Sequence, residues 1–123
     1  MAKSEGLTRQ QIELEIKKKN FSPIYLLCGD ESFYIDKIAD KILDNALSET
    51  ERDFNLTIFY GSEHNMTDVL LACKRYPVMA ERQVVFFREA TSIKNKTELE
   101  LLEHYALAPT PTTILVITYK NGS

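Results

Sequence analysis

The turn after the first apolar run is the place where this sequence could bind a phosphate. In α/β proteins a phosphate lies on the free N–H groups of the helix that follows the first strand. A loop that wraps a triphosphate and holds magnesium needs the pattern GxxxxGK[ST]. Here the turn reads Gly29-Asp30-Glu31-Ser32, with one glycine and no Lys-Ser or Lys-Thr after it. Asp30 and Glu31 would satisfy the helix N–H groups themselves and repel a triphosphate, so we interpret the turn as an anion site filled by the protein's own side chains.

The other residues with catalytic potential are scattered. His64 follows a predicted strand and His104 lies on a predicted helix, so we expect both to be ordinary surface residues. Ser32 is not in a GxSxG pattern. Cys28 and Cys73 are interpreted as small core residues, and no metal-ligand spacing occurs. The sequence therefore predicts no catalytic residue, no cofactor and no metal site.

One connecting segment carries apolar residues where loops are usually polar. Residues 75–83 read RYPVMAERQ. Pro77 suits the first position of a short helical turn, which would present Val78 and Met79 next to each other. Because loops run over the surface, two interpretations stay open. The pair packs against the next helix, or it forms an apolar knob for a partner's pocket, with methionine supplying adaptable packing.

Alternating helices and strands must position these residues. Strands are predicted at 24–28, 54–60, 83–87 and 113–118. The first two helices are predicted at 7–20 and at about 31–47, the second with Asp30 or Ser32 as its cap. The third begins at the capping box 65–68 and stops at Tyr76-Pro77, and the fourth runs from the capping box 95–98 to about 107. Residues 48–53 are predicted to form a polar loop. The first strand is a continuous apolar run, which is typical of a strand buried on both faces. The pattern predicts an α/β fold with a mostly parallel sheet flanked by helices.

Length and composition fit a single domain over residues 1–123. The chain is 44% hydrophobic with 6 Phe and 6 Tyr, which excludes intrinsic disorder. Its apolar runs are too short to span a bilayer, it begins without a signal-peptide pattern, and two cysteines fit a reducing cytoplasmic setting. A net charge of −3 argues against a domain that grips nucleic acid alone. The basic run Lys17-Lys18-Lys19 is interpreted as a solvated helix end.

Three segments resemble a known family. Residues 23–35, PIYLLCGDESFYI, resemble the opening P-x-Y-L-L-x-G-[DE]-E-x-[FY]-L-I of the delta subunit of bacterial DNA polymerase III, the clamp-loader subunit that opens the sliding clamp. Residues 51–55 resemble that family's run before its second strand. Residues 68–70 with 75–85 resemble its stretch of a small residue or proline, two apolar residues, a small residue, a polar residue and arginine. The resemblance spans about residues 20–118.

The resemblance implies a RecA-like first domain of an AAA+ protein that lacks a functional P-loop. It implies that the chain is an N-terminal clamp-binding domain, with the lid and the C-terminal collar domain absent from these 123 residues. Val78 and Met79 would enter a hydrophobic pocket of the beta sliding clamp, with Pro77 and Ala80 shaping the turn and Arg82 flanking it. The pair is smaller and less aromatic than the Leu and Phe that related chains often carry.

The implied function is to bind and open the clamp for loading onto primed DNA during replication. The chain would have no catalysis of its own, although the family is part of the DNA-directed DNA polymerase holoenzyme, a nucleotidyltransferase. ATP use would belong to other loader subunits. Gamma/tau and delta prime would join through the domains absent here, and DNA contact would be indirect or weak. Two alternatives remain: a nucleotide-binding α/β enzyme domain with an atypical phosphate loop, and direct DNA binding by Lys17, Lys18 and Lys19.

Overall fold

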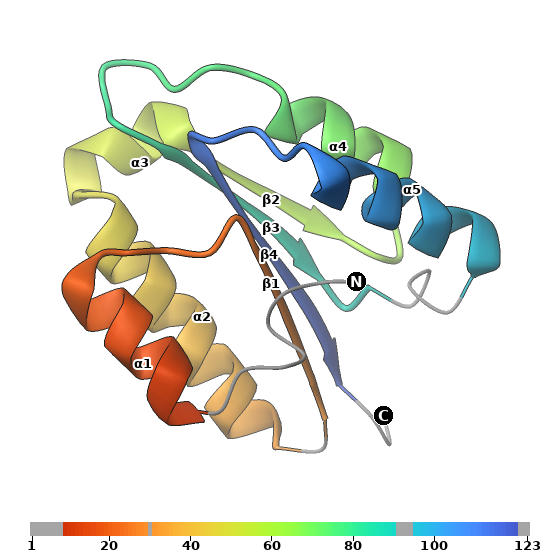
Figure 1. The fold of residues 1–123 in the computed structure, drawn as a ribbon, viewed down its shortest axis with the longest axis horizontal. Helices are drawn as coiled ribbons and strands as arrows, with labels where there is room; N and C mark the ends of the chain where they lie inside the picture. Colours follow the sequence, from red (N-terminus) through yellow and green to blue (C-terminus); the bar gives the residue numbers. More distant parts are fainter. Residues whose placement is uncertain (1–8, 30, 91–94, 121–123) are drawn as a thin grey trace.

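Four strands form one parallel sheet in the order β1-β4-β3-β2 (Figure 1). The computed structural model describes residues 9–29, 31–90 and 95–120. The strands are β1 Ile24–Gly29, β2 Leu56–Tyr60, β3 Gln83–Arg88 and β4 Thr113–Lys120. Leu115 of β4 lies opposite Ile24 on one side and Val85 on the other, so β4 joins the first strand to the third. The predicted parallel sheet is confirmed.

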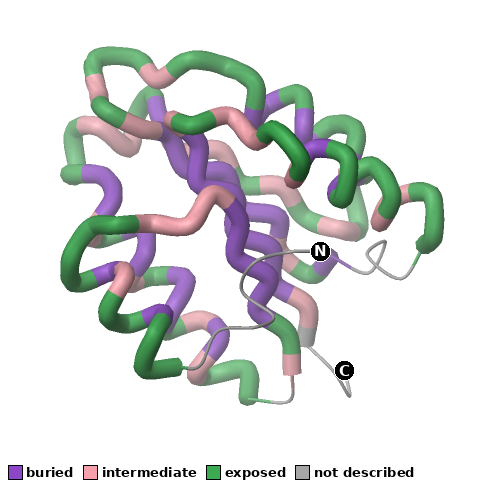
Figure 2. The backbone as a smooth tube through the Cα atoms, in the orientation of Figure 1, coloured by how far each residue is buried: buried purple, intermediate pink, exposed green. Residues whose placement is uncertain are grey.

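Helices cover both faces of this sheet (Figure 1). One face carries α1 Arg9–Lys18 and α2 Ser32–Ala46, and the other carries α4 Met66–Cys73 and α5 Lys96–Leu107. Since neighbouring residues of a strand point to opposite faces, Phe86 packs in the α1–α2 layer and Phe87 in the α4–α5 layer. Figure 2 shows the buried residues concentrated along the strands and the inner sides of the helices. Within the described ranges, no helix is long and apolar enough to cross a membrane.

A short helix, α3 Glu49–Asn55, replaces the loop predicted at 48–53. Ser48 caps it, because its hydroxyl accepts from the Glu51 N–H at 3.3 Å, and the Glu51 carboxylate accepts from the Ser48 N–H at 2.8 Å. This reciprocal pair satisfies two N–H groups that a helix start leaves free. The loop prediction was wrong for this reason, and strand β2 begins at Leu56 rather than at Phe54.

The later helix starts differ in how they are capped. Asn65 and Asp68 form the predicted capping box at α4. Asn95 caps α5 by accepting from the Thr97 and Glu98 N–H groups, as expected. The Glu98 carboxylate, however, accepts from the Met66 N–H at 2.6 Å. A side chain predicted to close its own helix start therefore joins α5 to α4.

The two cysteines lie in different environments. Cys73 on α4 is buried, as predicted. Cys28 is exposed, so its assignment to the core was wrong. Only the first four residues of β1 are buried, and Cys28 lies after them, near the carboxyl end of an edge strand. Burial raises the pKa of the Cys73 thiol to about 12.

We predict that Cys73 makes the fold less stable in alkali. Above about pH 9 the thiol ionises in the unfolded chain but stays neutral in the folded chain until about pH 12. The raised pKa therefore stabilises the fold fully below about pH 9, and this contribution is lost as pH rises above it, by up to about 1.4 kcal/mol per pH unit. Urea unfolding at several pH values measures the slope.

Cys73→Ala should reduce this alkaline slope, and Cys28→Ala should leave it unchanged, because Cys28 is exposed. The slopes are compared as differences from the parent chain, so that the common titration of lysines and tyrosines cancels. Equal slopes in the parent and Cys73→Ala would contradict the prediction.

Candidate functional site

The connection between α4 and β3, residues 74–82, forms the candidate site. It lies at the amino ends of the strands and arches from α4 toward α3 (Figure 1). Its backbone bends without forming the helical turn predicted from Pro77. Met79 has a φ of +53°, in the left-handed region that a right-handed helical turn cannot contain. That conformation explains why the prediction of a helical turn was wrong.

The two apolar residues singled out from the sequence lie on the surface. Met79 is 97% exposed and Val78 is 49% exposed, while Pro77 and Ala80 are half-buried. In Figure 2 most residues of this connection are coloured as exposed. The pair therefore does not pack fully against the next helix. Tyr76, which sequence reasoning passed over as a helix stop, is 85% exposed and adds an aromatic ring to the same connection.

A buried amide holds this connection in place. Asn55, at the last position of α3, is only 2% exposed. Its Oδ1 accepts from the Val78 N–H at 2.6 Å, and its Nδ2 donates to the Val78 carbonyl at 2.8 Å and to the Glu51 carbonyl at 2.9 Å. Sequence reasoning placed Asn55 inside a strand and missed it. The Ser48–Glu51 capping pattern was the signal that could have placed it at a helix end.

The base of the connection is fixed by two buried polar residues at the strand starts. Gln83 Nε2 lies 2.9 Å from the Arg75 carbonyl and 2.9 Å from Thr113 Oγ1. The Thr113 hydroxyl donates to the Cys73 carbonyl at 2.7 Å. The bond from Thr113 satisfies the Cys73 carbonyl, which is at the end of α4 and has no partner inside the helix. Both ends of the connection are thus joined to the sheet.

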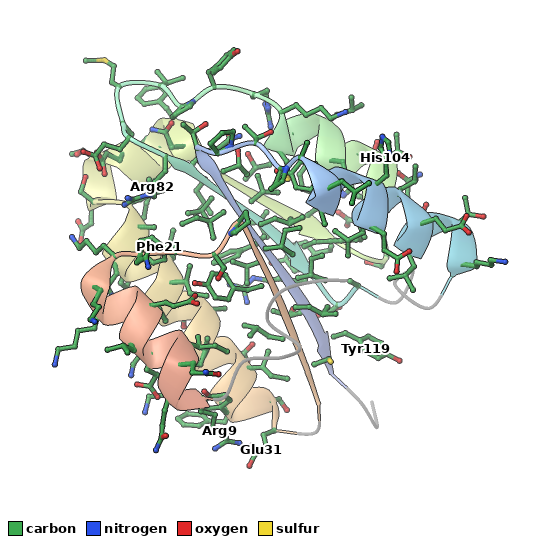
Figure 3. The ribbon with its side chains drawn as sticks, viewed as in Figure 1. Arg9, Phe21, Glu31, Arg82, His104 and Tyr119 are labelled. Carbon is green, nitrogen blue, oxygen red and sulfur yellow. The ribbon has the colours of Figure 1, made fainter. Side chains whose placement is uncertain are left out.

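Arg82 turns back toward the body of the domain. Its guanidinium lies 5.0 Å from the ring centroid of Phe21, within cation–π range, and 3.8 Å from the Glu81 carboxylate. Figure 3 shows Arg82 and Phe21 near each other, away from the end of the helices that carries Arg9 and Glu31. The interactions of Arg82 thus join the end of the connection to Phe21, before β1.

The turn expected to mimic a phosphate site is at the opposite end of the sheet. Glu31 is the N-cap of α2 but makes no side-chain hydrogen bond to the helix, so the prediction that it satisfies the N–H groups was wrong. Its carboxylate pairs instead with Arg9, whose guanidinium lies 3.9 Å from the Tyr34 ring centroid. Ser32 begins the helix rather than capping it, and Asp30 is outside the described residues.

The histidines do not build a second site. His64 is half-buried, with its ring edge-on to Phe59 at a centroid distance of 4.9 Å. His104 lies on the exposed side of α5 (Figure 3). In the parts of the chain that the structure describes, no three His, Cys, Asp or Glu residues are grouped to hold a metal ion. The connection 74–82, with Val78 and Met79 exposed on an anchored backbone, is therefore kept as the candidate site.

The sequence profile of the DNA polymerase III delta subunit family matches residues 25–123. The chain belongs to this family. The DNA polymerase III subunit delta of Bacillus subtilis is 28% identical over 109 residues, which cover 83% of this chain and 31% of that protein. The chain therefore spans about a third of the length of this delta subunit.

Solved structures show the same fold. The DNA clamp loader delta protein of Bacillus subtilis superposes with a TM-score of 0.78 at 24% identity, over 88% of this chain and 34% of that one. A DNA polymerase III gamma subunit-related protein from Thermotoga maritima has a TM-score of 0.63 at 9% identity, over 89% of this chain and 39% of that one. The expected α/β architecture, a parallel sheet flanked by helices, is confirmed.

We predict that Met79→Gly leaves the stability of this delta-family chain unchanged or raises it by up to about 1 kcal/mol. The left-handed backbone costs a residue with a Cβ about 1–2 kcal/mol, and glycine removes this cost. The greater conformational freedom of glycine in the unfolded chain offsets about 0.5–1 kcal/mol of that stabilisation. The exposed side chain contributes no burial that could be lost. Urea unfolding of both proteins measures the difference.

Met79→Ala is the matched control. It removes the same side chain but keeps the strained backbone, so its stability should lie below that of Met79→Gly. A loss of more than about 2 kcal/mol in the glycine variant, the size expected for a buried methionine, would contradict an exposed and strained Met79.

Proposed function

We propose that this chain is the clamp-binding module of a clamp-loader delta subunit. It binds the beta sliding clamp and helps to open it for loading onto primed DNA, without hydrolysing ATP. One observation carries the proposal: two adjacent apolar residues, Val78 and Met79, lie exposed on a connection whose backbone is anchored by hydrogen bonds. Family membership supplies the context in which such a pair has a partner.

The chemistry suits insertion into an apolar pocket. Removing apolar surface from water contributes about 25 cal/mol per Å², and a few central residues usually carry most of the energy of an interface. Met79 can adapt its flexible side chain to an irregular pocket. Because the backbone is already ordered by Asn55, binding loses less conformational entropy than it would with a free loop.

Clamp opening would follow from selective binding. A ligand shifts an equilibrium only by the difference in its affinity for the two states. We propose that the module binds a distorted clamp more tightly than a closed one, and so weakens one interface of the ring. ATP use would belong to other loader subunits, and gamma/tau and delta prime would contact the delta subunit through domains outside this chain. DNA contact would be indirect or weak, in keeping with the net charge of −3.

We predict that the double variant Val78→Ala/Met79→Ala loses at least about tenfold in affinity for the cognate clamp, since tenfold corresponds to about 1.4 kcal/mol and two central apolar side chains contribute at least that much. Surface plasmon resonance measures the affinity, and circular dichroism checks the fold. Phe33→Ala is the matched control, because Phe33 is an exposed apolar residue at the start of α2, away from the connection. Unchanged affinity in a folded double variant would rule out the pair as the contact.

A titration with ATP and magnesium tests the enzyme alternative. We expect no binding at concentrations of about 1 mM, that is, a binding free energy weaker than about −4 kcal/mol, because the turn at Gly29 lacks the lysine and hydroxyl of a phosphate loop. Micromolar binding that changes with Glu31→Gln would favour a nucleotide site. DNA binding that weakens with salt and is lost when Lys17, Lys18 and Lys19 are all substituted would favour the alternative of direct DNA binding.

A further inference from the structure

The buried polar side chains of this domain concentrate at the amino ends of the strands. Among the described residues four polar side chains are buried, and three of them, Asn55, Gln83 and Thr113, surround the connection 74–82. Burying a polar group is unfavourable unless it is hydrogen-bonded. The partners of such groups therefore show which part of the structure they hold. Gln83 and Thr113 hold the base of the connection, and Asn55 holds its exposed part.

Asn55 binds both main-chain polar groups of one residue. Its amide accepts from the Val78 N–H and donates to the Val78 carbonyl, as a neighbouring strand would. The second amide hydrogen is used by the Glu51 carbonyl inside α3. Turning the amide over would break all three bonds, so the peptide units on both sides of Val78 have one orientation relative to α3.

The residue after Val78 stands in a conformation that needs such support. Met79 has a φ of +53°, and its side chain is almost completely exposed, so side-chain packing does not hold that backbone in place. Strained backbone persists only where the surrounding structure determines it. The bonds from Asn55 to Val78 are the interactions next to Met79 that do so.

We propose that Asn55 is the positioning residue of the clamp-binding connection. It holds the main chain at Val78 so that the side chains of Val78 and Met79 stand together in the orientation that the clamp pocket accepts. This inference rests on the proposed function. Asn55 is itself buried, and its side-chain hydrogen bonds go to the main chain of Val78 in the connection and of Glu51 in α3, so it acts through the exposed pair and not by contact with the partner.

The expected effect on affinity follows from the population of the competent conformation. The apparent dissociation constant is the intrinsic one divided by the fraction of molecules in that conformation. If losing both bonds to Val78 reduces this fraction to about a tenth, the affinity of Asn55→Ala for the clamp falls about tenfold. Asn55→Asp keeps the acceptor for the Val78 N–H but places a carboxylate oxygen against the Val78 and Glu51 carbonyls, so we expect a loss at least as large.

Amide hydrogen exchange tests the anchoring without the clamp. In the parent chain the backbone N–H of Val78 should be protected, and in Asn55→Ala it should exchange faster. The backbone N–H of Gln83, which donates to the Thr112 carbonyl, should keep its exchange rate. An unprotected Val78 amide in the parent chain overturns the proposal without any variant, so the test stands even if Asn55→Ala does not fold.

A double-mutant cycle separates positioning from general stability. In the Val78→Ala/Met79→Ala background, Asn55→Ala should have no further effect on clamp affinity, because the pair through which it acts is gone. A persistent tenfold loss in that background would overturn the proposal. Asn95→Ala is the matched control, since it removes a side-chain cap at the start of α5 and should leave the affinity unchanged.

The two proposals fail in different ways. If the parent chain does not bind the cognate clamp, the proposed function is wrong, and the exchange rate of the Val78 amide still decides whether Asn55 holds the connection. If the parent chain binds and Asn55→Ala binds equally well, the proposed function stands and Asn55 is not the positioning residue.

Discussion

The need to cover both faces of a parallel sheet governs the rest of this structure. The central strands β3 and β4 are buried on both sides, so helices must cross from the carboxyl end of one strand to the amino end of another on either face. The fold therefore has two separate sets of connections. Those at the carboxyl ends, where nucleotides bind in such sheets, include the turn at Gly29, which places the acidic Glu31 beside Arg9. The connection 74–82 belongs to the second set, at the amino ends of the strands.

At the amino ends, polar and apolar groups are arranged opposite to their usual places. Asn55, Gln83 and Thr113 are buried, and Val78 and Met79 are exposed. Each hydrogen bond adds only about 1 kcal/mol to stability, whereas an orphaned buried partner costs up to about 3 kcal/mol. The buried amides therefore fix one backbone arrangement more strongly than they stabilise the whole fold. The exposed pair gains a defined position from them without being buried itself.

The sequence predicted the elements whose signal is local. Short apolar or alternating runs marked the four strands, and the polar residues Asn65 and Asn95 marked two helix starts. It failed where polar residues serve the tertiary structure. The segment at 48–53 was interpreted as a loop because it is polar, although Ser48 and Glu51 carry a capping pattern. Asn55 could not be recognised, because its partner Val78 lies 23 residues away. The outward position of Val78 and Met79 was one of two interpretations left open by the sequence. The hydrogen bonds between Asn55 and the Val78 main chain help to explain it.

Asn55 recognises Val78 only through its main-chain N–H and carbonyl. The hydrogen bonds from Asn55 to the connection therefore do not involve the side chains at positions 78 and 79. Exchanging either side chain thus leaves the main-chain groups that Asn55 binds in place. The same separation makes the connection a natural place for transplanting other two-residue sequences, so that one scaffold could be directed to a different surface.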